Sequence, residues 1–357
     1  MKRIDSIIAT AIKDGVFPGC VLGFVLPNGS RQVQAYGFDE FESSAQPMTE
    51  KTLFDVASVT KSIPVGTLAL KRILEGHLSL ETLVCELIPE FAPSFRNEVR
   101  VWHLLTHSLD YRFPMSSLKD LPPAQILERI FTHKFEARPG SLFNYGNASS
   151  LILGVLLERL EGRSLHQVAV SEFFEPLGMS DSGWFPLESH RLEQIAPTEV
   201  CPWRGQTMRG VVHDESAFAM RAYGPVGSAG LFSTVPDVLR FAQMMLGDGM
   251  FDEQRIMPAG VLSMVTENRL EHLAGQGTAL GWELENRRFM GSVVSPRSFG
   301  KTGFTGTSIV CDPDRNAALV LFSNFTWPKR EASVDRIYQV RRHLADAFFG
   351  ALERVTA

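Results

Sequence analysis

The strongest constraint on the fold is that strand-like segments gather near the two ends of this 357-residue chain. Residues 19–26 and 31–36 are apolar runs joined by an Asn-Gly turn at 27–30, a pattern that predicts a β-hairpin. Strand character returns near the other end, at residues 281–284, 308–311 and 317–323. Terminal strands that flank a helical region commonly form one sheet, so we predict a mainly antiparallel sheet built from both ends.

Helical periodicity dominates the middle of the chain, from about residue 77 to 225. A length of 357 residues suits two domains. We therefore predict an α/β sheet domain formed by residues 1–62 and 226–357, with a mainly helical domain inserted at 63–225. The fold class is thus α/β plus all-α, an antiparallel sheet flanked by helices with a helical insertion.

Individual helices follow from apolar spacing and from residues that start or stop a helix. Ile4, Ile8 and Ala11 lie on one face of a first helix that ends at Gly15. We also predict a helix at 58–76 that ends at Gly76 and a helix at 147–161 that is stopped by Gly162. A further helix at 236–246 is predicted to be capped by Ser233 or Thr234. Pro64 falls within the first two turns of the 58–76 helix, where proline is better tolerated. Further helices are expected at 168–174 and 330–350.

The composition is that of an ordinary globular protein, with 44% hydrophobic residues and a net charge of −5. This mild acidity argues against a nucleic-acid partner. Four cysteines lie far apart without a C-x-x-C pair, which excludes a zinc ribbon or a thioredoxin motif. We interpret them as buried free thiols, although two disulfides stay open as an alternative; they are Cys20, Cys85, Cys201 and Cys311.

The N-terminal segment lacks the apolar core of a secretory signal. No run of about 18 apolar residues occurs, so no membrane span is expected. With Met1 as the natural start, these features predict a cytoplasmic protein.

Ser58-Val59-Thr60-Lys61 is the first candidate for chemistry. If Ser58 opens a helix, Lys61 lies one turn further on the same face, and the helix N-terminus favours negative charge at the serine. A serine hydroxyl needs a nearby base, and a desolvated lysine can serve as one. The alternative, which is more common for an isolated S-x-x-K, is an N-cap serine beside a solvated lysine.

Two other short motifs have similar ambiguity. Tyr145-Gly146-Asn147 precedes the 147–161 helix, and a tyrosine acts as a base only when cations lie beside it. Asn147 could bind a lysine or a substrate amide, or simply cap the helix. Lys301-Thr302-Gly303 is expected on or beside a strand, where a lysine and a hydroxyl suit a carboxylate-bearing ligand; the alternative is a strand-end turn.

Together, in this order, the three motifs resemble those of the penicillin-recognising serine enzymes, whose acylation motifs are S-x-x-K and K-T-G. The Y-x-N element is similar to that of the class C β-lactamases, the D,D-peptidases and the related esterases. Segments at 54–61, 101–107, 227–241 and 300–308 also resemble the family, so the likeness spans roughly residues 15–325. The chain departs from the family after His107, where Ser108-Leu109-Asp110 replaces the usual Thr-Ser-Gly.

The resemblance implies a role for each motif residue. Ser58 would be the acylated nucleophile, and Lys61 and Tyr145 would share the general-base work with support from Lys301. The backbone amides of Ser58 and Phe304 would form the oxyanion hole. Residues that would orient the substrate are Asn147, Thr302 and Gly303. No cofactor and no metal are implied.

Two other groups of residues have spacings that could indicate different chemistry. His103 and His107 have the i, i+4 spacing of a zinc site, but the glutamate of that motif is absent, so packing and capping are favoured. In the segment 212–215, His213 precedes two acids. Adjacent residues of an extended chain point to opposite faces, and in the family a similar segment lies in a structural loop, so it is given no catalytic role. The absence of G-x-S-x-G argues against an α/β-hydrolase esterase.

The function predicted first is a serine acyl hydrolase of the carboxylesterase or D-peptidase type, acting on small esters or amides. A β-lactamase is the alternative, and a catalytically inactive binding protein on the same fold is the alternative from another class. Lys301 favours a substrate with a carboxylate, whereas the missing export signal argues against cell-wall substrates. The expected partner is a small ester, amide or β-lactam, and the sequence does not indicate an oligomeric state.

Overall fold

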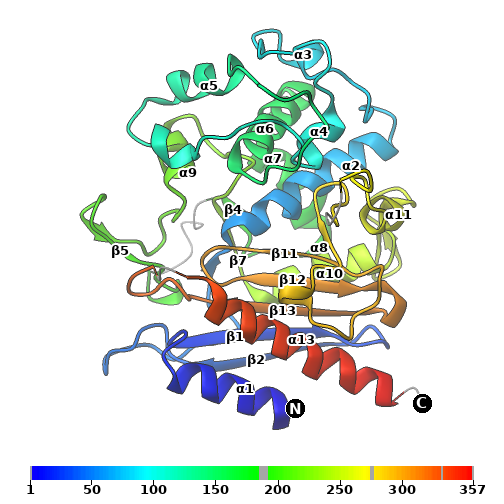
Figure 1. The fold of residues 1–357 in the computed structure, drawn as a ribbon. Helices are drawn as coiled ribbons and strands as arrows, with labels where there is room; N and C mark the ends of the chain where they lie inside the picture. Colours follow the sequence, from blue (N-terminus) through cyan, green and yellow to red (C-terminus); the bar gives the residue numbers. More distant parts are fainter. Residues whose placement is uncertain (1, 185–191, 274–276, 331–332, 356–357) are drawn as a thin grey trace.

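A six-stranded antiparallel sheet forms the centre of the molecule in the computed structural model, which describes residues 2–184, 192–273, 277–330 and 333–355 (Figure 1). Its strands, in spatial order, are β10 (Glu283–Leu284), β11 (Phe299–Thr302), β12 (Ser308–Asp312), β13 (Ala317–Ser323), β1 (Gly19–Val25) and β2 (Arg31–Gly37). The first strand of the chain, β1, pairs directly with the last strand, β13, with Cys20 opposite Ser323. The predicted sheet from both ends is confirmed.

Helices cover both faces of this sheet because the side chains of its central strands alternate between two cores. Leu22 and Phe24 of β1 pack with α1 (Lys2–Lys13) and α13 (Asp335–Val355). Val21 and Val25 pack on the other face with α10 (Val235–Leu246). Figure 1 shows α1 and α13 lying together across one face of the sheet.

The middle of the chain is mainly helical, as predicted, and lies above the sheet in Figure 1. The helix α6 (Asn147–Glu161) is its buried centre and ends at Gly162, which has a left-handed φ of 64°. The other α-helices are α2 (Thr67–Leu74), α3 (Val84–Leu87), α4 (Val101–Leu105), α5 (Pro123–Phe131), α7 (Leu165–Ala169), α8 (Glu175–Leu177), α9 (Glu215–Ala219), α11 (Val261–Thr266) and α12 (Arg287–Met290). The domain boundaries at 62/63 and 225/226 stay predictions.

Several short strands lie outside the main sheet, and all but β3 (Phe54–Asp55) were not predicted. The strand β4 (Gly183–Trp184) pairs with β7 (Leu231–Ser233), which also pairs with β3 (Phe54–Asp55). Two further hairpins pair two residues on each side, β5 (Val200–Cys201) with β6 (Gln206–Thr207) and β8 (Met250–Phe251) with β9 (Gln254–Arg255). Strands of two or three residues are too short to show an alternating pattern.

The predicted continuous helix over 58–76 is wrong. The chain forms a 3₁₀-helix, η1 (Ala57–Lys61), then a wide turn, η2 (Ser62–Gly66), and only then α2. Ile63 has extended dihedrals, with φ −111° and ψ 111°. The ring of Pro64 disfavours the helical conformation of the residue before it, so the helix breaks at Ile63.

The other predicted elements occur with shifted bounds. The strand expected at 281–284 is reduced to Glu283–Leu284 because Gly281 has a positive φ of 77° and packs against Gly66. The helix expected at 168–174 is split between α7 and η4 (Val170–Phe174). Thr234 caps α10 by accepting a hydrogen bond from the Asp237 amide, as predicted. The remaining 3₁₀ turns are η3 (Met115–Leu118), η5 (Leu192–Gln194), η6 (Met220–Ala222) and η7 (Pro313–Arg315).

All four cysteines are free thiols, in agreement with the preferred interpretation. Cys20, Cys201 and Cys311 are buried, whereas Cys85 is half-buried. None of the helices in the described ranges combines the length and the apolar character that a membrane span needs.

One ion-pair cluster joins three helical elements, and we expect that breaking it lowers the stability of the protein strongly. Arg72 of α2 pairs with Glu161 of α6, with Glu75 at 2.6 Å and with Glu172 of η4 at 2.8 Å. Its side chain is 8% exposed. Changing Arg72 to Met would leave these partly buried carboxylates without their shared guanidinium, and we expect the free energy of unfolding to fall by about 3 kcal/mol.

The measurement is urea denaturation followed by circular dichroism, with Arg159→Met as the matched control. Arg159 pairs with Glu90 at 2.6 Å, but both side chains are about half exposed. Such a pair contributes at most about 1 kcal/mol. Equal losses in the two variants would contradict the structural role given to the Arg72 cluster.

Candidate active site

Ser58 lies at a sharp turn between a strand and a short helix. The strand β3 ends at Asp55, Ala57 has a positive φ of 48°, and Ser58 is the second residue of the five-residue helix η1. Ser58 therefore does not open an α-helix, which corrects the predicted charge stabilisation by a long helix. A non-glycine residue in this conformation costs about 1–3 kcal/mol and is held by its surroundings. The Asp55 carboxylate accepts a hydrogen bond of 2.8 Å from the Ala57 amide.

The predicted contact between Ser58 and Lys61 is present. The Lys61 ammonium Nζ lies 2.9 Å from the Ser58 Oγ and also donates to the Asn147 Oδ1 at 2.8 Å and the Ser228 carbonyl at 2.6 Å. Lys61 is only 3% exposed. Burial, aided by the charge of Lys301, lowers the pKa of Lys61 below its usual value, which makes the neutral amine accessible.

A close backbone contact brings the Ser228 carbonyl to Lys61. Gly227 packs against Gly154 of α6, and a Cβ added at Gly227 would lie 2.1 Å from the Ser150 carbonyl. Only glycine allows this approach. The glycine- and serine-rich passage at 226–234 therefore positions an acceptor for the buried lysine.

Asn147 is the first residue of α6, and the cap position belongs to Gly146. Its side chain joins two charged groups: the oxygen accepts from Lys61, while the Nδ2 donates to the Asp214 carboxylate at 2.8 Å and to the Ser216 hydroxyl at 3.0 Å. The alternative that Asn147 only caps a helix is wrong.

Tyr145 lies between the two lysines. Its ring centroid is 4.3 Å from the Lys301 Nζ and 5.5 Å from the Lys61 Nζ, and the ring packs against His107 with centroids 4.8 Å apart. Burial alone would raise the pKa of Tyr145, but the charges of Lys301 and Lys61 bring it below its usual value. Proximity to cations is the condition under which a tyrosine can act as a base.

Lys301 has an anionic partner that the sequence analysis missed. Its Nζ lies 2.5 Å from the Glu283 carboxylate, and the lysine is 3% exposed. Glu283 lies in the neighbouring strand β10, opposite Gly300. Burial alone would lower the pKa of Lys301, but Glu283 and Tyr145 raise it, so the lysine stays protonated. In the sequence, Glu283 stood out only as a single acidic residue within a short predicted strand.

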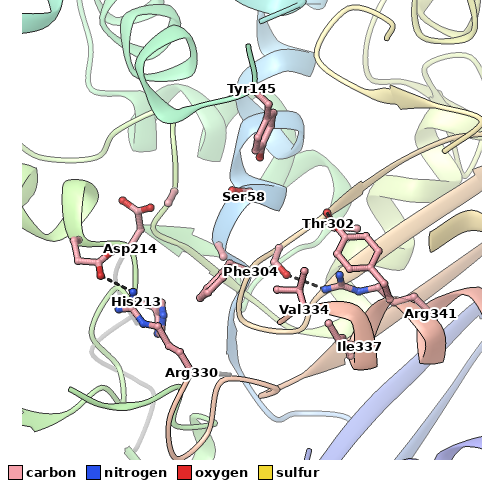
Figure 2. Close-up of a pocket in the computed structure, with 15 residues that line it drawn as sticks. Ser58, Tyr145, His213, Asp214, Thr302, Phe304, Arg330, Val334, Ile337 and Arg341 are labelled. Atoms are coloured by element: carbon pink, nitrogen blue, oxygen red, sulfur yellow. Dashed lines mark hydrogen bonds and ion pairs between the residues drawn. The ribbon is translucent and has the colours of Figure 1, made fainter. Parts of the chain in front are cut away.

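Thr302, Gly303 and Phe304 continue from β11 to the cavity beside Ser58 (Figure 2). A Cβ added at Gly303 would lie 2.4 Å from the Val56 carbonyl, so this position requires glycine. The guanidinium of Arg341 donates to the Gly303 and Thr307 carbonyls, both at 2.8 Å. These contacts tie the loop after β11 to α13, while Gly303 lies close to the turn before Ser58.

Two further threonines fix the same loop. Thr305 donates to the Asp55 carbonyl at 2.8 Å and Thr307 donates to the Val56 carbonyl at 2.9 Å. Phe304, directly before Thr305, stays 44% exposed and lines the cavity. The loop is therefore rigidly placed while its tip remains open to a ligand.

The cavity at Ser58 has a volume of about 470 Å³. Both His213 and Asp214 line it, and the absence of a catalytic role for the 212–215 segment stays a prediction. Asp214 caps α9 through the Ala217 amide and accepts from Asn147, and Lys61 helps to keep its pKa below the usual value against the effect of burial. Burial lowers the pKa of His213 to about 3, so its ring is neutral.

The alternative zinc site at His103 and His107 is not formed. The His103 Nδ1 accepts a hydrogen bond from the Arg100 amide at 2.9 Å, so the predicted capping role is confirmed. His107 instead packs against Tyr145. Among the described ranges, no cluster of three or more His, Cys, Asp or Glu side chains could bind a metal ion.

Asp55 ties two parts of the site together and predicts a pH dependence. Its carboxylate accepts from the Ala57 amide and, at 2.7 Å, from the His213 amide. Burial raises the pKa of Asp55 to about 6, and Asp214 acts in the same direction. Protonation below pH 6 removes an acceptor from the turn before Ser58, so kcat/KM should fall as the pH decreases through about 6. The kcat/KM of Asp55→Asn should be about tenfold lower than that of the native enzyme, and it should not fall as the pH decreases through 6.

The matched control for this pH profile is Asp237→Asn. Burial also raises the pKa of Asp237 to about 6, and its carboxylate accepts from the Asp181 amide and the Ser182 hydroxyl, outside the cavity. The Asp237→Asn enzyme should keep the acidic limb. An unchanged limb in Asp55→Asn would contradict the role given to Asp55.

Comparison with known proteins gives one family and several similar folds. A family model described as Beta-lactamase matches residues 4–343. Two proteins named "Putative D-alanyl-D-alanine carboxypeptidase", from Escherichia coli O157:H7 and strain K12, are 30% and 31% identical to this chain; each alignment covers 91% of this chain and 82% of the relative.

Solved structures share the fold at lower sequence identity. EstCE1, described as a hydrolase with promiscuous acyltransferase activity, is 23% identical with a TM-score of 0.78, and the match covers 98% of both chains. A class C β-lactamase is 21% identical with a TM-score of 0.77, over 97% of this chain and 95% of that one. The predicted fold of an antiparallel sheet with flanking helices is that of these structures.

Proposed function

The chain belongs to the Beta-lactamase family and is a serine hydrolase, and on this premise we propose that it hydrolyses small esters or amides through an acyl-enzyme on Ser58. The observation that carries the proposal is the 2.9 Å contact between the Lys61 Nζ and the Ser58 Oγ, in a site where burial lowers the pKa of the lysine. The names of the 30–31% identical relatives support peptide-type amides as one substrate class.

The first half of the reaction transfers the acyl group to the serine. Lys61 and Tyr145, acting as a coupled pair, take the proton of the Ser58 hydroxyl while its Oγ attacks the substrate carbonyl carbon. The bond from that carbon to the leaving oxygen or nitrogen then breaks, and the proton passes to the leaving group. Lys301 keeps positive charge beside Tyr145 and so favours the anionic phenolate.

The negative charge that develops on the carbonyl oxygen needs donors. We assign this role to the backbone N–H groups of Ser58 and Phe304, a type of contact worth roughly 3 kcal/mol for each donor. Within the part of the chain that the structure describes, neither N–H donates to another protein group. Both residues line the same cavity, which supports the assignment.

The second half of the reaction returns the free enzyme. Water, activated at Tyr145, attacks the acyl carbon, the bond to the Ser58 Oγ breaks, and the serine recovers its proton. We assign substrate orientation to Asn147, Thr302 and Gly303; Thr302 and Gly303 line the cavity at Ser58, and Asn147 contacts Lys61.

The test is to trap the acyl-enzyme with two substrates, a nitrophenyl ester and a chromogenic cephalosporin. Acid quenching followed by peptide mass mapping should find the acyl group on Ser58, and ester turnover should exceed cephalosporin turnover. No adduct on Ser58 would overturn the proposal. Faster turnover of the cephalosporin would instead favour the β-lactamase alternative.

A further inference from the structure

The cation of the K-T-G motif is already paired inside the protein. The Lys301 Nζ lies 2.5 Å from the Glu283 Oε1, and the lysine side chain is 4% exposed while that of Glu283 is 24% exposed. Asn286 donates to the other carboxylate oxygen at 2.7 Å, which fixes its orientation. A substrate carboxylate that approached Lys301 would therefore meet the negative charge of Glu283 first.

Three other cations that border this site also have protein partners. Lys61 donates to three neutral acceptors, and Arg330 is held by Glu199 and Glu215 at 2.8 and 2.5 Å. Arg341 is 4% exposed and donates to two backbone carbonyls of the loop after β11. Breaking any of these contacts for a substrate carboxylate would leave a buried acceptor or a carboxylate without its partner, which is costly.

Carboxylates of the protein line the same cleft. Asp214 and Glu215 lie on one side of Tyr145 and Glu283 on the other. A substrate carboxylate in this cleft would be repelled by these charges, and a partly buried site screens the repulsion weakly. The electrostatic environment around Ser58 thus resembles a neutral site rather than a receptor for an anion.

We propose that Glu283 is a specificity-determining residue that makes the site select acyl donors without a carboxylate near the scissile bond. This inference rests on the proposed function and narrows it. Uncharged esters and amides would be preferred, and substrates that end in a carboxylate beside the reacting carbonyl, such as a C-terminal D-amino acid or a cephalosporin, would be disfavoured.

Glu283 could instead act only by tuning the base, because its charge raises the pKa of Tyr145. Such an effect would change the turnover of every substrate by a similar factor. The ratio of kcat/KM between two substrates that differ only in charge is insensitive to it. That ratio is therefore the readout that separates selection of the substrate from tuning of the base.

The experiment uses two aryl esters with the same acyl group, whose leaving phenol has either a meta-carboxylate or a meta-carboxamide. The native enzyme should prefer the carboxamide ester by about tenfold or more in kcat/KM. Glu283→Gln should shift the ratio by about tenfold or more toward the carboxylate. The control Glu285→Gln, which removes a cleft carboxylate that pairs with Arg287 instead, should leave the ratio within about twofold.

Two results would overturn the inference: a native enzyme that turns over both esters equally, or a Glu283→Gln enzyme with the native ratio. The first needs no variant, so it holds even if Glu283→Gln fails to fold. Failure of the proposed function looks different, because the carboxamide ester would then form no adduct on Ser58 in the native enzyme.

Discussion

Replacing Ser58 with alanine is expected to lower kcat/KM for a nitrophenyl ester by about 10⁵- to 10⁶-fold. The reason is that Oγ is the only atom at this position that can form the covalent intermediate, while the Lys61 amine and the oxyanion donors remain. The substitution removes one oxygen next to a cavity, where it accepts a hydrogen bond from the Lys61 Nζ. The thermal midpoint should therefore change little.

The measurement combines steady-state turnover with labelling by a fluorophosphonate. Labelled native enzyme and unlabelled Ser58→Ala enzyme, at equal circular dichroism, would agree with the assignment. Ester turnover within about tenfold of the native rate in Ser58→Ala would show that another group is the nucleophile.

Replacing Lys61 with methionine is expected to slow acylation by about 10³-fold, in the range of one general base. Methionine keeps the length and the apolar part of the side chain but cannot move a proton. Asn147 Oδ1 and the Ser228 carbonyl lose a donor, at a cost of roughly 1–3 kcal/mol each, which removal of a buried cation offsets in part. The burst of nitrophenol in stopped-flow measurements reports the acylation rate directly.

Lys71→Met is the matched control for this variant. Lys71 is also buried, and it pairs with Glu172 and the Ile256 carbonyl, away from the cleft. Its replacement should lower stability and leave the burst rate within about twofold. Near-native acylation in Lys61→Met would mean that Tyr145 alone takes the proton.

The sequence motifs predicted the centre of the site because each is local. Ser58 and Lys61 belong to one short helix, so their contact at 2.9 Å survives even though that helix is a 3₁₀-helix rather than the predicted α-helix. The break itself was predictable in principle, since Ile63 precedes a proline. The two-ended sheet was predictable because strand patterns at both ends had no other partners of comparable length.

The surroundings of the motifs could not be predicted from local pattern. Glu283 reaches Lys301 only because β10 and β11 pair with Glu283 opposite Gly300, and a shift of one residue would turn it to the other face. Asp214 lies at the cavity because it caps α9 while its second oxygen meets Asn147, a residue far away in sequence. Contacts of this kind depend on register and helix packing, which no single segment encodes.

The hydrogen bond between Thr305 and the Asp55 carbonyl joins residues 250 positions apart in the chain. The nucleophile and one proposed oxyanion donor thus come from segments far apart in the sequence, and they meet only when the long stretch of chain between them has closed. Closure over such a distance is slow compared with the formation of local helices. Recovery of ester turnover during refolding would therefore be a late event, and catalytic activity reports completion of the fold more stringently than helix content does.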